Sequence, residues 1–183
     1  MCKNYFIKAI AASLITVSSI AAAVTTPGGT VHFKGVIVNA ACAVSADSVD
    51  QTVNLGQYRT ANFKAIGDKT GLVPFKIKLQ DCDSSVAKTA AATFSGNADR
   101  KDNTVLSTSN IGGGASGAAS GVGIEIADRQ GNVIVPNSGN FSTAQTLNDG
   151  NNELNFTARY KSTSDEVTPG QADADATFTM KYE

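Results

Sequence analysis

The last fourteen residues of the chain alternate between two kinds of side chain. From Gly170 to Glu183, every second position is small or apolar and the positions between them are polar or charged. The small and apolar positions are Gly170, Ala172, Ala174, Ala176, Phe178, Met180 and Tyr182. Because successive side chains of a strand point to opposite faces, this period of two predicts a β-strand with one buried face.

A second alternating segment lies near the N-terminus. Gly29, Val31 and Phe33 alternate there with polar neighbours, and the segment precedes the other predicted strands. The pattern predicts a strand that lies outside any obvious domain. A chain that can form a strand at both of its ends is suited to lending one of them to a neighbouring molecule.

Between these ends, short apolar runs recur and helical periodicity is nearly absent. Clusters of Gly, Asn, Asp and Ser separate the runs, as at 128–132 and 148–151, which predict turns. Glu125, between Ile124 and Ile126, is predicted to point outward. The runs lie at 36–38, 53–55, 73–79, 92–94, 122–126, 133–135 and 154–160. Together with the C-terminal strand they predict an all-β sandwich with Greek-key connections.

Residues 1–23 have the organisation of a secretory signal peptide. Lys3 and Lys8 form a basic start, residues 9–20 are apolar, and small residues place cleavage after Ala22 or Ala23. About twelve apolar residues are too few to span a bilayer as a helix. The sequence therefore predicts export rather than a membrane anchor.

Two cysteines remain after this cleavage, Cys42 and Cys82. In an exported protein a disulfide between them is the default expectation. A metal or redox pair is the weaker alternative, because it needs closer spacing or further His and Cys ligands. We therefore predict a disulfide and neither a metal nor a cofactor.

Charge and composition narrow the function further. Removal of the signal leaves 13 of the 15 basic residues against 16 acidic ones, a net charge of −3, which argues against a nucleic-acid partner. His32 is the only histidine and lies in the N-terminal segment, so no catalytic triad can be built. A glycine pattern at 112–117 is followed by a predicted strand instead of the helix that a phosphate site needs. We expect neither an enzyme nor a small-molecule substrate.

Several segments together carry a family resemblance. They are GGTVHFKG at 28–35, VNAACAV at 38–44, SVDQTVNLGQYRT at 48–60, LQDCD at 79–83, NFTARY at 155–160 and ADATFTMKY at 174–182. Gly170 stands fourteenth from the C-terminus and Tyr182 is penultimate. With these features the chain resembles the major structural subunit of type 1 fimbriae, in the chaperone–usher pilin family. The likeness covers essentially the whole region after the signal peptide.

The resemblance implies an incomplete immunoglobulin-like Greek-key sandwich that lacks its final strand. A neighbouring subunit or a periplasmic chaperone would complete it by donating a strand, and the extension of the next subunit would replace the chaperone strand at an outer-membrane usher. Residues 24–34 would be the donor extension and 35–183 the pilin domain. The donor residues would be Gly29, Val31, Phe33 and Gly35. The seven small and apolar positions from Gly170 to Tyr182 would form one wall of the groove and would be recognised by the chaperone.

The implied function is the structural rod subunit of an adhesive fimbria, which polymerises head to tail with identical subunits. It would pass through the periplasm to the cell surface. A minor adaptor pilin is the alternative within the same system. A secreted carbohydrate-binding β-sandwich is the more remote alternative, and the absence of Trp argues against it because such sites use aromatic platforms.

Overall fold

The computed structural model describes residues 26, 28–109 and 117–183. The predicted signal peptide with its cleavage site, and most of the glycine pattern at 112–117, lie outside the described residues. Within the described part of the chain, no helix is long and apolar enough to cross a membrane. Residues up to Val36 separate from the body, residues 37–183, so the two units are considered individually.

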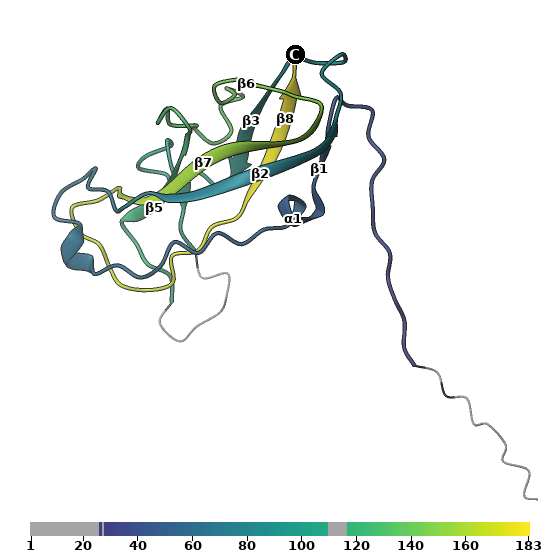
Figure 1. Ribbon diagram of the computed structural model, residues 1–183. Coiled ribbons are helices and arrows are strands. Elements are labelled where there is room, and N and C mark those ends of the chain that lie inside the picture. Colours follow the sequence, from purple (N-terminus) through teal and green to yellow (C-terminus); the bar gives the residue numbers. More distant parts are fainter. Residues whose placement is uncertain (1–25, 27, 110–116) are drawn as a thin grey trace, which may run out of the picture. The chain divides into compact units, whose positions relative to one another are not determined.

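Two antiparallel sheets form the body (Figure 1). The five-stranded sheet has the order β1-β2-β7-β5-β4 and the three-stranded sheet the order β6-β3-β8. The strands are β1 (Ala43–Val44), β2 (Val73–Cys82), β3 (Thr89–Gly96), β4 (Leu106–Ser107), β5 (Val122–Asp128), β6 (Gln145–Thr146), β7 (Gly150–Ser162) and β8 (Ala176–Tyr182). Two short helices are also present, α1 (Ala46–Val49) and the 3-10 helix η1 (Thr60–Asn62). Non-consecutive neighbours such as β2 and β7 require the crossing connections of a Greek key.

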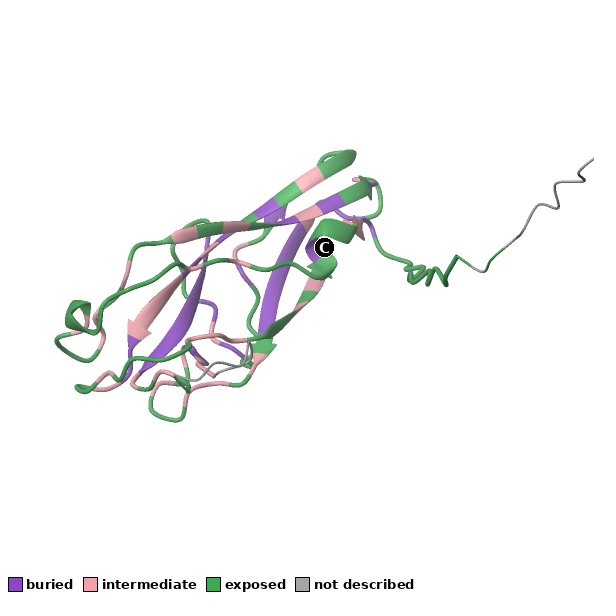
Figure 2. Ribbon diagram, turned by 90° about the horizontal axis from the view of Figure 1, so that it is seen from below, coloured by how far each residue is buried: buried purple, intermediate pink, exposed green. Residues whose placement is uncertain are grey.

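The core lies between the sheets and follows the alternation of the strands. In β2 and β7, Ile77, Leu79, Leu154 and Phe156 are fully buried, whereas the residues between them are more exposed. Phe156 packs edge-on against Phe94 of β3, with ring centroids 5.3 Å apart. Figure 2 shows the buried stretches on the strands and largely exposed connecting loops. The apolar face of each strand therefore accounts for the sandwich.

Four of the predicted strands are confirmed, and four are not. The runs at 73–79, 92–94, 122–126 and 154–160 became β2, β3, β5 and β7. The N-terminal segment 29–33 is not a strand. The runs at 36–38 and 53–55 are not strands, and 133–135 makes only a single bridge, from Val133 to Ala127. The C-terminal strand begins at Ala176, and the stretch before it makes isolated bridges. Alternation shows that a segment can form a strand, but a strand also needs a neighbouring backbone to pair with.

Glu125 points to the outer face of β5, as predicted, but that face is covered and the side chain is only 2% exposed. Residues from other segments cover this face of β5. Lys69 lies 3.0 Å from the Glu125 carboxylate, and Arg159, its partner across the β5–β7 pair, lies 2.7 Å from it. Burial raises the pKa of Glu125, but the hydrogen bonds from Lys69 and Arg159 outweigh burial and lower it overall. Glu125 therefore stays charged and ties the segment around Lys69 to the sheet.

The turn predicted at 128–132 is confirmed and is organised by one carboxylate. Asp128 is 2% exposed and accepts hydrogen bonds from the backbone N–H groups of Gln130, Asn132 and Thr143. The Thr143 hydroxyl adds a bond of 2.6 Å. Burial raises the pKa of Asp128, but the bonds from Thr143 and Asn132 outweigh it and lower the pKa to about 2.

We expect Asp128 to make the protein acid-labile. Because its pKa is lower in the folded chain than in the unfolded chain, its contribution is complete above about pH 4. That contribution, about 2 kcal/mol, disappears as the pH falls toward 2. Urea unfolding of the wild type and of Asp128→Asn between pH 7 and pH 2 measures it. The stability difference between the two should shrink on acidification; a constant difference would contradict this assignment.

Candidate strand-binding groove

One wall of the candidate site is the free edge of the three-stranded sheet. Among the described residues, β8 is the last strand in this sheet and pairs only with β3. Thr89 and Glu183 exchange two backbone hydrogen bonds, of 2.8 and 3.1 Å. Because bonded pairs alternate along an antiparallel ladder, the odd-numbered residues of β8 bond to β3 and the even-numbered N–H and C=O groups point away from it. These outward groups form an unpaired edge.

The same edge continues upstream of β8, where its backbone bonds to residues 109, 117 and 119 instead of to β3. Gln171 bonds to Gly117 and Ala119, and Asp173 exchanges two bonds with Ser109. The odd-numbered residues are again the bonded ones, so the even-numbered backbone groups of residues 170–174 point the other way. We call residues 168–174 the upstream wall.

Gly170 makes this arrangement possible. A Cβ atom at Gly170 would lie 2.5 Å from the backbone carbon of Ala118 and 2.5 Å from the backbone nitrogen of Ala119. A Cβ atom essentially never lies this close to a non-bonded heavy atom, and backbone atoms cannot swing aside as a flexible side chain does. The glycine that the sequence placed in an alternating strand is therefore a close-approach point between two backbones.

The opposite wall is the extended segment that follows α1. No backbone-to-backbone hydrogen bond joins residues 50–58 to another described segment. Val53 and Leu55 are half-buried, and Leu55 packs against the core. The alternation that predicted a strand here therefore reflects a segment with one face on the core and no partner strand on its open side.

A groove of about 1780 Å³ lies between the two walls. In Figure 1, the coil after α1 and the segment leading into β8 run along the same side of the body. Apolar residues from both sheets reach the groove, among them Phe75, Phe94, Leu106, Ile124, Ile126, Ala158 and Phe178. Sites for small molecules usually enclose about 300–1000 Å³. A larger apolar groove between two unpaired edges suits an extended polypeptide, which pairs with both edges and fills the floor with alternate side chains.

Tyr160 of β7 connects the two walls. Its ring packs edge-on against Tyr58, with centroids 5.9 Å apart, and its hydroxyl donates to the Ala172 carbonyl at 3.0 Å. Both tyrosines line the groove. Burial, together with the Asp173 carboxylate and Tyr58, raises the pKa of Tyr160. The hydroxyl therefore stays protonated and remains a donor at neutral pH.

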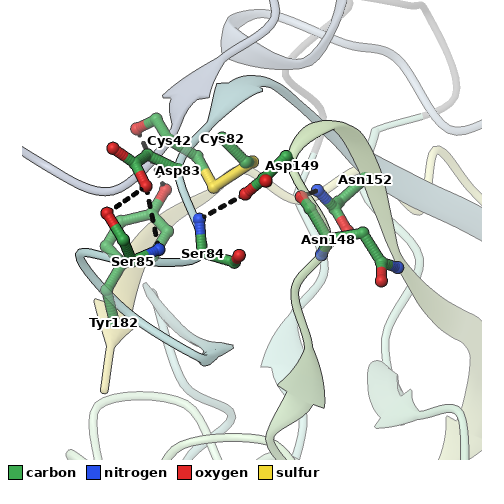
Figure 3. Close-up of a disulfide and its surroundings, with 9 residues drawn as sticks. All are labelled: Cys42, Cys82, Asp83, Ser84, Ser85, Asn148, Asp149, Asn152 and Tyr182. Carbon is green, nitrogen blue, oxygen red and sulfur yellow. Dashed lines mark hydrogen bonds between the residues drawn. A yellow bond between two sulfur atoms is a disulfide. The ribbon is translucent and has the colours of Figure 1, made fainter.

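The predicted disulfide between Cys42 and Cys82 is present (Figure 3). It joins the chain just before β1 to the end of β2, with Cα atoms 4.1 Å apart. Asp149 accepts a bond from the Ser84 N–H, and Asp83 accepts one from Ser85, both at 2.8 Å. Tyr182 lies beside the disulfide, with its hydroxyl 3.4 Å from the Cys42 carbonyl oxygen. The bridge thus ties the start of the body to the end of β2 in the five-stranded sheet.

The predicted wall residues divide into two groups. Gly170, Ala172, Ala174, Ala176 and Phe178 line the groove. Met180 and Tyr182 do not line it; they are half-buried and pack against the core. Neither the second wall nor the role of Tyr160 was predicted from the sequence. The apolar positions Val53 and Leu55 indicated a segment with one buried face. They do not show that this segment lacks a paired strand on its open side.

The predicted donor residues lie in the separate N-terminal unit. Val31 is 74% exposed and Phe33 is 92% exposed. Gly29 has a φ of +140°, and within the described part of the chain no atom lies within 4 Å of a Cβ placed at Gly29 or at Gly35. The boundary between extension and body, predicted after Lys34, stays a prediction. Two large apolar side chains on one face of an extended segment are suited to filling a groove.

Comparisons with known proteins identify the family. Residues 31–183 match the family described as fimbrial protein. Fimbrial subunit type 1 of Salmonella typhimurium is 54% identical over 177 residues, which cover 94% of this chain and 95% of the relative. The type-1 fimbrial protein A chain of Escherichia coli K12 is 48% identical, with 94% and 93% covered.

Solved structures show the same relationship. The P pilus rod subunit PapA matches with a TM-score of 0.65 at 28% identity, and the match covers 79% of this chain and all of PapA. A subunit from a chaperone–usher pilus, solved in a study of rod uncoiling, gives 0.68 at 29% identity, with 89% and 100% covered.

The fold and the groove define an incomplete β-sandwich with an apolar groove between its two walls. The chain belongs to the fimbrial protein family, with type 1 fimbrial subunits among its relatives. The predicted fold class, an incomplete immunoglobulin-like sandwich, is confirmed. The protein is a structural subunit of an extracellular fimbria that polymerises with other pilin subunits, and it is not an enzyme.

Proposed function

We propose that this protein forms the rod of a type 1-like fimbria by donor-strand exchange. The observation that carries the proposal is the groove between two unpaired backbone edges. Each subunit inserts residues 24–34 into the groove of a neighbour, so Val31 and Phe33 fill the apolar floor. An interface in which one end of a subunit binds the other end of the next does not close, and it therefore produces a filament.

The glycines of the donor strand have a separate role in this scheme. Gly29 and Gly35 carry no side chain, which allows the inserted backbone to approach the walls closely. We assign Gly29 to setting the register of the incoming strand, because it lies on the same face as Val31 and Phe33.

Assembly requires protection of the groove before polymerisation. Unpaired edges beside an apolar floor are an aggregation hazard. A periplasmic chaperone that supplies a temporary strand meets this need, and an outer-membrane usher then exchanges that strand for the extension of the next subunit. The subunit therefore passes through the periplasm on its way to the surface. Abundance in filaments sheared from cells distinguishes a rod subunit from a minor adaptor pilin.

Deletion of residues 24–36 tests the proposal. The deleted protein keeps its groove but has no strand to donate, so we expect it to accumulate as a chaperone-bound monomer. Electron microscopy of sheared surface material, with immunoblotting of periplasmic extracts, measures both outcomes. The matched control carries Thr30→Ala and His32→Ala, which alter only the polar face of the extension and should leave filaments intact. Filaments built from the deleted protein would overturn the proposal.

A further inference from the structure

The Ala172 carbonyl is an acceptor on the open edge of the groove. Its neighbours Gln171 and Asp173 use their backbone groups to bond with residues 109, 117 and 119. In an extended segment, the backbone groups of the intervening residue point the opposite way. The Ala172 oxygen is therefore directed to the side on which an inserted strand pairs with the upstream wall.

The partner of this carbonyl is a side chain from the other sheet. The Tyr160 hydroxyl donates to the Ala172 oxygen at 3.0 Å, and β7, which carries Tyr160, lies in the five-stranded sheet. The Tyr160 ring is held from the opposite wall by Tyr58. Tyr160 thus reaches both edges of the groove at the end where Gly170 docks against Ala118.

An inserted strand would compete with the Tyr160 hydroxyl for the Ala172 oxygen. An unpaired carbonyl in a partly buried site is unfavourable, so the Tyr160 hydroxyl stabilises the groove while it is empty. A strand that pairs with the upstream wall offers a backbone N–H to the same oxygen. That N–H is part of a continuous ladder, and it comes with the burial of apolar side chains on the groove floor.

We propose that the Tyr160 hydroxyl is a placeholder donor, which satisfies the Ala172 carbonyl in the empty groove and releases it to the N–H of an inserted strand. The inference rests on the strand-insertion function proposed above. It makes Tyr160 a positioning residue that keeps the upstream wall in place until a strand arrives.

The proposal predicts opposite effects on the two states of the protein. Tyr160→Phe keeps the ring and its contact with Tyr58 but removes the hydroxyl. The empty protein loses one hydrogen bond, whereas the strand-bound protein loses none. The variant should therefore unfold at a lower urea concentration when empty and at the wild-type concentration when bound. Its affinity for a donor strand should rise roughly two- to tenfold, the effect of one net hydrogen bond.

The test uses the protein that lacks residues 24–36, whose groove no other copy can fill, and a fluorescently labelled peptide of residues 24–36; residues 37–183 form a compact unit of their own. Urea unfolding is followed with and without saturating peptide, and the peptide dissociation constant is measured by anisotropy. Tyr182→Phe is the matched control, because its hydroxyl also faces a backbone carbonyl, that of Cys42, at 3.4 Å. Tyr182 does not line the groove, so its loss should shift the empty and bound forms equally.

Each result decides a different question. If the wild type takes up no peptide, the strand-insertion function itself fails. If the wild type binds peptide and Tyr160→Phe binds it with unchanged affinity, the hydroxyl is a structural contact in both states and the placeholder role is wrong. Weaker binding by Tyr160→Phe also overturns it, because the hydroxyl would then contact the inserted strand.

Discussion

A peptide of residues 24–36 is expected to raise the thermal midpoint of the protein that lacks those residues by roughly 5–10 °C. The peptide binds only the folded groove, and at a hundredfold excess over its dissociation constant it stabilises the fold by about 2.7 kcal/mol. One kcal/mol corresponds to roughly 2–4 °C for a domain of this size. Calorimetry at increasing peptide concentration measures the shift.

The apolar face of the peptide carries this effect. Burial of Val31 and Phe33 contributes about 1.5–3 kcal/mol each, and pairing with two backbone edges adds to it. Replacement of both by Ser should abolish the shift. Replacement of Thr30 and His32 by Ala is the matched control and should preserve it. Gly29→Leu should slow binding, because the side chain keeps the strand from approaching the wall. Equal shifts of the thermal midpoint for all of these peptides would show that the groove does not distinguish the apolar face of the strand from its polar face.

Gly170→Ala is expected to destabilise the protein by about 1–3 kcal/mol and to weaken donor binding at least tenfold. The new Cβ atom would lie 2.5 Å from backbone atoms of Ala118 and Ala119, so the upstream wall has to move away from them. That movement breaks the bonds of 2.7 and 2.9 Å that join Gln171 to Ala119 and Gly117. Urea unfolding and peptide binding measure the two losses.

The control for this substitution is Gly71→Ala. No atom lies within 4 Å of a Cβ at Gly71, and Gly71 does not line the groove. Its stability should change by no more than about 0.5 kcal/mol. If Gly170→Ala behaved like Gly71→Ala, the close approach between the upstream wall and residues 118–119 would not be what positions this wall.

The alternation of apolar and polar residues was sufficient to predict the long strands, but it did not show which other segments cover them. β2 and β7 follow from alternation, because each presents an apolar face to one core throughout its length. Glu125 shows the limit of this reasoning: alternation placed it on the outer face of β5, and it is on that face. Segments distant in the sequence cover the face, and Lys69 and Arg159 supply the charges that make burial of a carboxylate tolerable.

The sequence by itself determined the long strands β2, β5 and β7, which of their side chains face the core, and that Cys42 and Cys82 are available to pair. The alternation from Gly170 onward also indicated one wall of the groove. Only the tertiary structure decided that this wall and residues 50–58 lie on opposite sides of an apolar floor, and that Tyr160 reaches from one to the other. The reason is physical. The face to which a side chain points is set by the local backbone, whereas the pairing of a strand edge depends on which other segments lie beside that edge.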